Sequence, residues 1–262
     1  MRFLAANGGV AHFADDGPRG GRAVVFINSL GTDFRIWDKV GDAIARQRRV
    51  IRYDKRGHGL STHAKEAGAI ADFSLDLAAL MDRLEVGAAT IVGLSIGGLI
   101  AQELYRLRPD LVASLVLCDT GHKIGTREMF RARVETVEKG GIEAIADGVL
   151  QRWFTEEYRK NYPEMMAGWR AMLTRTPKPG YIAACLAIGE ADLTQAAKSI
   201  RAATLVIVGD QDGSTPPPLA RETAALIPGA RLEIVERAGH LPCIERPEVT
   251  SRLIEAHLKE IA

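Results

Sequence analysis

The sequence predicts an α/β fold, in which helices flank a mostly parallel central sheet. Short β-type runs alternate with segments of helical periodicity, and this alternation is typical of parallel strands joined by crossover helices. The middle runs are apolar at nearly every residue, as strands buried on both faces must be. The 262 residues, 47% of them hydrophobic and 26% charged, suffice for one large core and exclude a disordered chain, collagen or a small disulfide scaffold.

The first fifteen residues predict a short hairpin at an edge of this sheet. Further strands are expected at residues 23–27, 49–53, 90–92, 114–117, 205–208 and 232–235. Three helices are expected between and after them. Residues 74–84 are amphipathic, with Leu75 among the apolar positions near one face. Residues 99–107 follow the strand at 90–92 after a glycine-rich turn, and residues 247–261 form a closing helix that starts at a proline.

Between residues 121 and 201 the strand pattern stops. This stretch predicts several helices, broken at Gly140-Gly141, Pro163, Pro177–Gly180 and Gly189. An all-helical insertion of this size within a βα series indicates a cap. We therefore expect a core made of residues 1–120 and 202–262, with a helical cap, residues 121–201, inserted after the sixth strand.

Charge and composition favour a small-molecule partner. Lysine and arginine total 34 against 33 acidic residues, a net charge of +1, so no basic excess points to nucleic acid or to an anionic membrane. The N-terminus lacks a continuous apolar stretch, and the longest uncharged run, residues 86–102, is just short of a membrane span, which predicts a cytoplasmic protein. Three widely spaced cysteines suggest neither a disulfide framework nor a zinc site.

A candidate nucleophile lies in Gly93-Leu94-Ser95-Ile96-Gly97, between an expected strand and an expected helix. This is the context of a nucleophile elbow, a sharp turn that glycines on both sides of the serine permit. The turn holds the Ser95 hydroxyl out at the top of the sheet and aims the helix N-terminus at a developing oxyanion. The alternative, a chance match in a glycine-rich chain, is less consistent with the flanking strand and helix.

A serine hydroxyl needs a histidine base, and that base needs an acid behind it. His240 follows the strand at 232–235, and Asp212 follows the strand at 205–208, which gives the chain order serine, acid, histidine. Asp210 and Asp119 also follow strands and are alternative acids. We favour Asp212, which lies further beyond its strand end and can turn back toward the histidine. His58, in a loop after a strand, is expected to hold that loop rather than act as a base.

Stabilising an oxyanion requires two backbone N–H groups. One is expected from Ile96, the residue after the nucleophile, and the other from the loop at residues 28–33, where we choose Leu30 as the donor.

Taken together, these motifs resemble the α/β-hydrolase superfamily over nearly the whole chain. A closer resemblance is to the 3-oxoadipate enol-lactonases, carried by residues 28–33 followed by Trp37-Asp38, and in the cap by residues 152–155 and 180–188. The resemblance implies that Ser95 attacks the ring carbonyl of the enol-lactone, with no metal and no organic cofactor.

The same resemblance implies roles for three further residues. Trp153 would form a flat wall against the lactone ring, or else close the cap's own core. Arg152 or Arg35 would meet the substrate carboxylate, although each taken alone is more typical of a solvated surface arginine. The expected partner is a small lactone or ester, and the expected assembly is a monomer or homodimer.

Two other readings stay open. Another carboxylesterase, or a C–C bond hydrolase of the same fold, would share the triad and differ in the cap. A receptor-like protein would keep the triad but only bind its ligand.

Overall fold

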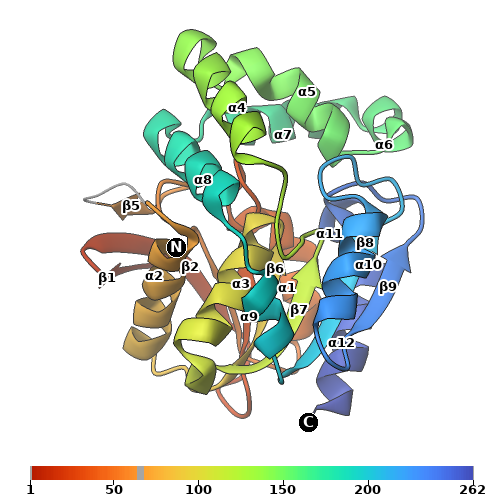
Figure 1. Cartoon of the computed structure of the whole chain (residues 1–262). Helices are drawn as coiled ribbons and strands as arrows, with labels where there is room; N and C mark the ends of the chain where they lie inside the picture. The colour runs from red at the N-terminus through yellow and green to blue at the C-terminus, as the bar shows by residue number, and fades with distance from the viewer. Residues whose placement is uncertain (1, 64–67, 262) are drawn as a thin grey trace.

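The computed structural model describes residues 2–63 and 68–261 (Figure 1). The described residues form a sheet in the order β1-β2-β4-β3-β6-β7-β8-β9, in which β1, β2 and β4 pair antiparallel and all later neighbours pair parallel. The predicted fold class and its edge hairpin are thereby confirmed. The strands are β1 (Arg2–Ala6), β2 (Gly9–Asp16), β3 (Val24–Ile27), β4 (Val50–Tyr53), β5 (Thr62–His63), β6 (Ala89–Leu94), β7 (Val112–Cys118), β8 (Ala203–Gly209) and β9 (Arg231–Val235).

Helices cover both faces of the sheet. Helix α2 packs against α3 on one face, and α1 packs against α12 on the other (Figure 1). The core helices are α1 (Asp38–Ala45), α2 (Ile70–Arg83), α3 (Ile96–Leu107), α10 (Pro217–Leu226), α11 (Pro242–Glu245) and α12 (Pro247–Glu260), with short 3-10 turns η1 (Phe34–Trp37) and η2 (Pro109–Leu111). Leu75 differs from its prediction, because it faces solvent on α2.

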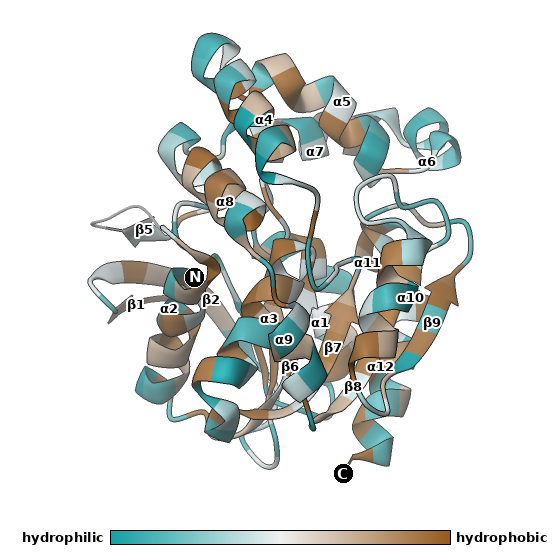
Figure 2. Cartoon of the chain, viewed as in Figure 1, coloured by the Kyte–Doolittle hydropathy of each residue, from teal (hydrophilic) through white to brown (hydrophobic). Residues whose placement is uncertain are grey.

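The hydrophobic core lies along the central strands. Every residue of β3, β4 and β6 is buried, which explains why these strands are mostly apolar, whereas edge strand β9 is only partly covered. Figure 2 shows the same layering: the central strands are hydrophobic and the outer helix faces are hydrophilic. All three cysteines are buried and unpaired. Within the described chain, no helix is long and apolar enough to span a membrane.

Six helices occupy the stretch between β7 and β8. They are α4 (Arg127–Gly140), α5 (Glu143–Trp153), α6 (Glu156–Asn161), α7 (Pro163–Thr174), α8 (Lys178–Glu190) and α9 (Thr194–Ser199). Helices α4 to α8 lie over one end of the sheet, whereas α9 returns to the core and contacts α3 (Figure 1).

The insertion follows the strand predicted at residues 114–117, as expected. That strand is β7 and not the sixth in the chain, because the two-residue β5, too short to show a period, also pairs with β2. One detail of this stretch differs from the sequence prediction. Gly189 does not break a helix, because α8 continues through it. Glycine suits this position because a side chain there would press on Phe130 of α4.

Candidate active site

Ser95 stands at the junction of β6 and α3 in a backbone conformation that L-residues rarely adopt. Its φ is 59° and its ψ is −118°. Neighbouring groups hold this turn: the Ser95 N–H donates to the Cys118 carbonyl over 3.0 Å, and the Ser95 carbonyl accepts from the Thr120 hydroxyl over 2.6 Å. Such strain persists only when its surroundings fix it, as these contacts do.

The glycines of the elbow are required by close backbone approach. A Cβ on Gly93 would lie 2.1 Å from the Gly97 carbonyl oxygen, and one on Gly97 would lie 2.6 Å from the Ile27 carbonyl oxygen. No side chain can be accommodated against backbone at such distances. The G-x-S-x-G spacing is therefore a steric condition for this turn.

His240 and Asp212 form a buried hydrogen-bonded pair. The His240 Nδ1 atom lies 2.9 Å from Asp212 Oδ2 and 3.0 Å from Oδ1. The N–H groups of Ser214 and Thr215 donate to Asp212 Oδ1, and the Thr215 hydroxyl donates to Oδ2 over 2.7 Å. Burial alone would raise the pKa of Asp212, but the attraction of His240 and these hydrogen bonds outweigh it and lower the pKa to about 2. The carboxylate is thus ionised at neutral pH and orients the imidazole.

The alternative acids are placed differently. Asp210 is exposed and accepts a hydrogen bond from the Ala238 N–H. Asp119 is fully buried beside the pair, so that one side-chain atom each of Asp119, Asp212 and His240 lie within 4.8 Å of one another. Burial and the adjacent Asp212 charge raise the pKa of Asp119 well above its usual value. Such spacing also suits a metal ion, but Nδ1 of His240 and both Asp212 oxygens already have hydrogen-bond partners.

Ser95 and His240 open into one cavity of about 200 Å³ beneath the inserted helices. Leu30, Arg152 and Trp153 also line it, as the sequence predicts for a substrate site. Trp153 is nearly buried and serves both the cavity wall and the core between the helices. The full lining is Ser29, Leu30, Ser95, Ile124, Gly125, Met129, Phe130, Arg133, Val149, Arg152, Trp153, Tyr181, Ile188, Gly213, Ser214, Thr215 and His240.

Arg133 of α4 is a cavity residue that sequence reasoning missed. Its Cζ atom lies 5.2 Å from the centre of the Phe130 ring. Arg133 and Arg152 have no acidic partner within 4.0 Å among the described residues. Burial and repulsion from Arg133 lower the pKa of Arg152. Two cations that repel each other across a cavity and lack a counter-ion make that cavity suitable for an anionic ligand.

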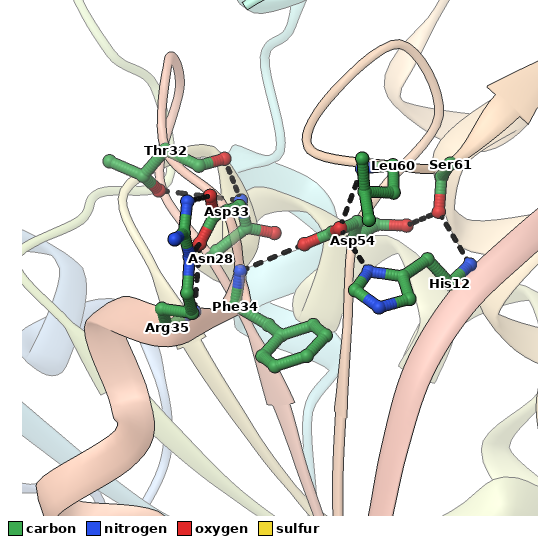
Figure 3. Close-up of polar contacts among 9 residues, drawn as sticks. All are labelled: His12, Asn28, Thr32, Asp33, Phe34, Arg35, Asp54, Leu60 and Ser61. Carbon is green, nitrogen blue, oxygen red and sulfur yellow. Dashed lines mark hydrogen bonds and ion pairs between the residues drawn. The ribbon is translucent and has the colours of Figure 1, made fainter. Parts of the chain in front are cut away.

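Arg35 does not reach this cavity. It lies in a separate groove of about 820 Å³ between η1 and α7, where its guanidinium is bonded to Asp33 over 2.6 Å (Figure 3). The reason is local: Asp33 caps η1, and its carboxylate accepts both the backbone N–H and the side chain of Arg35. Arg35 is therefore satisfied by its own turn and is not available as the carboxylate anchor.

The same groove contains a second histidine–aspartate pair, His12 and Asp54, joined over 2.7 Å (Figure 3). Ser61 lies beside it but bonds the backbone: its oxygen accepts from the His12 N–H and its hydroxyl donates to the Asp54 carbonyl. Asp54 also accepts from the N–H groups of Phe34 and Leu60. This cluster ties three loops together and does not arrange a serine toward a histidine ring.

The two expected oxyanion donors flank the cavity from opposite elements. Ile96 is the first residue of α3, so its N–H has no acceptor within the helix. Leu30 lines the cavity, and the next residue, Gly31, has a φ of +73° and packs tightly against Leu173 of α7. The buried Ser29 hydroxyl has no hydrogen-bond partner among the described residues and is available to a ligand.

His58 is remote from this site. It is fully buried, its Nδ1 lies 3.1 Å from the Arg56 carbonyl, and burial lowers its pKa well below the usual value. These contacts agree with the expectation that it holds its own loop.

Close contacts join the inserted helices to the core around the cavity. The Glu245 carboxylate accepts from the N–H and hydroxyl of Thr155 and from the N–H of Gly239, next to His240. Gly180 of α8 crosses Gly57 so closely that a Cβ on it would lie 2.3 Å from the Gly57 carbonyl oxygen. The position of the inserted helices is thus coupled to the loop that carries His240.

Comparisons with known proteins agree with this geometry. The family model for the alpha/beta hydrolase fold matches residues 22–247. The chain is 31% identical to 3-oxoadipate enol-lactonase 2 of Acinetobacter baylyi, over 98% of this chain and 96% of that protein. The solved enol-lactonase of Burkholderia xenovorans superposes with a TM-score of 0.95 at 36% identity, covering 98% of this chain and 100% of that one. A thermophilic esterase from Thermogutta terrifontis, solved with malate bound, gives 0.93 at 29% identity and covers 100% and 99%. The chain therefore belongs to the α/β-hydrolase fold family.

Proposed function

We propose that the protein is a serine hydrolase that opens 3-oxoadipate enol-lactone to 3-oxoadipate. One observation carries the proposal: the cavity holds Ser95 and His240 together with two guanidinium groups that have no counter-ion among the described residues. The proposed substrate presents an ester carbonyl to the serine and a carboxylate to the cations. The likeness to enol-lactonases over nearly the whole chain supports the same substrate.

In the first half-reaction, His240 takes the proton of the Ser95 hydroxyl as the oxygen attacks the ring carbonyl. The N–H groups of Leu30 and Ile96 receive the oxyanion. The carbonyl–oxygen bond of the ring then breaks, and His240 returns its proton to the departing enol oxygen. Because the enol tautomerises to a ketone, ring opening is hard to reverse.

In the second half-reaction, His240 removes a proton from water, which attacks the acyl-enzyme ester. The bond to Ser95 breaks, the serine recovers its proton, and 3-oxoadipate is released with two carboxylates. Asp212 keeps the imidazole in one orientation and tautomer throughout. These steps need no metal or organic cofactor. The cavity volume of about 200 Å³ suits a small, enclosed substrate rather than a lipid chain.

We place this activity in the cytoplasm, in a monomer or homodimer with no nucleic-acid or membrane partner, which is consistent with the balanced net charge of +1.

The test compares the rates at which the purified protein and its Ser95→Ala variant open the enol-lactone and hydrolyse p-nitrophenyl acetate. We expect the lactone to be turned over far faster than the acetate, and only when Ser95 is present. A preference for the acetate would reduce the assignment to another carboxylesterase or to a C–C bond hydrolase. A Ser95→Ala protein that still performs the cellular role would favour a receptor-like function instead.

Arginine variants test the carboxylate anchor within the same assay. Arg133→Met and Arg152→Met should each raise the KM for the lactone about 10- to 100-fold, because a charge-assisted hydrogen bond contributes about 1.5–3 kcal/mol. Arg35→Met is the matched control, since that guanidinium lies outside the cavity. An equal KM increase in the control would contradict the anchor assignment. So would a KM increase for p-nitrophenyl acetate, because this ester has no free carboxylate for an arginine to bind.

A further inference from the structure

Lys55 is a buried cation directly behind the oxyanion loop. It follows β4, the residue is 1% exposed, and its Nζ donates to the Ser29 carbonyl oxygen over 2.5 Å. Among the described residues, no carboxylate lies within 4.0 Å of this Nζ. Burial lowers the pKa of Lys55 well below its usual value, although Asp54 and Asp33 attract the charge. Full burial of a lysine without an ion pair is costly, so this position requires a specific reason.

The bonded carbonyl belongs to the peptide unit whose N–H is the expected oxyanion donor. The Ser29–Leu30 peptide is trans, and in a trans peptide the C=O and N–H point in opposite directions. Ser29 and Leu30 line the cavity with Ser95, whereas Lys55 is not among the lining residues. A carbonyl that points back to Lys55 therefore leaves the Leu30 N–H pointing toward the cavity.

Neighbouring groups fix both ends of this contact. The Thr32 hydroxyl also donates to the Ser29 carbonyl over 2.9 Å, and the Asn28 amide donates to the Thr32 carbonyl (Figure 3). On the other side, the Asp54 carboxylate bonds the Phe34 N–H over 2.8 Å, which fixes the backbone from which Lys55 extends. The Lys55 contact thus joins two loops that are each already rigid.

We propose that Lys55 is a positioning residue for the oxyanion hole. Its Nζ fixes the plane of the Ser29–Leu30 peptide and, by donating to the carbonyl, polarises the N–H at the other end of the same peptide. This role rests on the proposed serine mechanism. It does not depend on whether the amine is protonated, because both forms carry N–H donors.

The central test is Lys55→Met, which keeps the length of the side chain and removes the donor. We expect kcat to fall about 10- to 100-fold for both the lactone and p-nitrophenyl acetate, with KM nearly unchanged. This loss is smaller than the 10²–10³-fold expected when an oxyanion donor is removed outright, since the Leu30 N–H stays in place but is less well oriented. The thermal midpoint should not decrease, because a buried amine that has no carboxylate partner among the described residues is replaced by an apolar group.

A trifluoromethyl ketone, which adds to a serine nucleophile to form a tetrahedral oxyanion, provides the readout that a purely structural role would not affect. Its affinity should fall in Lys55→Met by the same factor as kcat. Thr32→Val removes another side-chain donor to the same carbonyl, which the Asn28 amide also approaches at 3.5 Å. The Lys55 and Thr32 substitutions should therefore be coupled, with a combined loss different from the product of the single losses.

Arg52→Met is the matched control. Arg52 is also a buried cation near the end of β4, but it pairs with Asp16 and Asp38 and does not contact the oxyanion loop. The Arg52→Met substitution should lower the thermal midpoint while leaving kcat unchanged.

Three outcomes would overturn the proposal: a folded Lys55→Met protein with kcat within twofold of wild type, a loss confined to KM, or an unchanged affinity for the trifluoromethyl ketone. The proposed function fails separately, if Ser95→Ala remains active. An inactive Ser95→Ala variant together with a fully active Lys55→Met variant would refute only the proposed role of Lys55.

Discussion

Replacing Ser95 by glycine should stabilise the protein relative to replacing it by alanine, although both variants lose the proposed nucleophile. At φ 59° and ψ −118° a residue with a Cβ is strained by about 1–3 kcal/mol, and glycine is not. Glycine in turn stabilises the unfolded chain by about 0.5–1 kcal/mol through its greater freedom. The difference leaves Ser95→Gly more stable than Ser95→Ala by about 1 kcal/mol.

Thermal and urea unfolding, followed by the fluorescence of the three tryptophans, measure this difference. For a chain of 262 residues, about 1 kcal/mol corresponds to a midpoint shift of about 2 °C. Ser74 of helix α2 provides the control. The Ser74→Gly variant should be less stable than Ser74→Ala by about 1 kcal/mol, because glycine relieves no strain in a regular helix. If Ser95→Ala proves as stable as Ser95→Gly, the elbow stores no backbone strain at Ser95.

Gly180→Ala should lower the unfolding free energy by about 1–3 kcal/mol and should also lower kcat/KM for the lactone, because the new methyl group pushes helix α8 away from the loop after β4. Unchanged unfolding and kinetics would contradict the close approach of Gly180 to Gly57. Glu245→Leu should lower the unfolding free energy in urea by about 2–5 kcal/mol, since it leaves three buried donors unpaired, and a change below 1 kcal/mol would show that water replaces the carboxylate. Asp212→Asn should reduce kcat about 10³- to 10⁴-fold while Asp119→Asn retains most of it; equal losses would refute the choice of acid.

The sheet was predictable because its central strands are buried on both faces, so burial itself selects continuous apolar runs such as β6 and β7. Features that depend on tertiary contacts were not predictable from the sequence. The two residues of β5 carry no period, and Gly189 continues a helix because α8 approaches Phe130 closely there. A glycine in a sequence indicates either a break or a close contact, and only the packed structure separates the two.

In the candidate site, too, some residues could be predicted from the sequence and others depend on tertiary packing. Ser95, Asp212 and His240 each follow a strand, and the ends of parallel strands meet at one edge of a sheet, so their proximity could be inferred from order alone. The cations could not be inferred in this way. Arg133 is one of several arginines on α4, and whether it faces solvent or the cavity depends on how that helix sits. Arg35 is occupied by Asp33, two residues earlier, which the helix-capping pattern alone could have indicated.

Asp119 and Asp212 show how the surroundings give two neighbouring carboxyl groups different roles. Folding lowers the pKa of Asp212 to about 2, so its contribution to stability is complete above 3.8 and is lost as the pH falls through 2. Folding raises the pKa of Asp119, so stability is lost as the pH rises above 3.8, where only the unfolded chain has released the proton. Asp119→Asn should therefore gain stability relative to wild type as the pH rises above 3.8. Burial therefore disfavours the charged form of Asp119, whereas hydrogen bonds and His240 favour the charged form of Asp212, and this difference is why we propose Asp212 as the acid that orients His240.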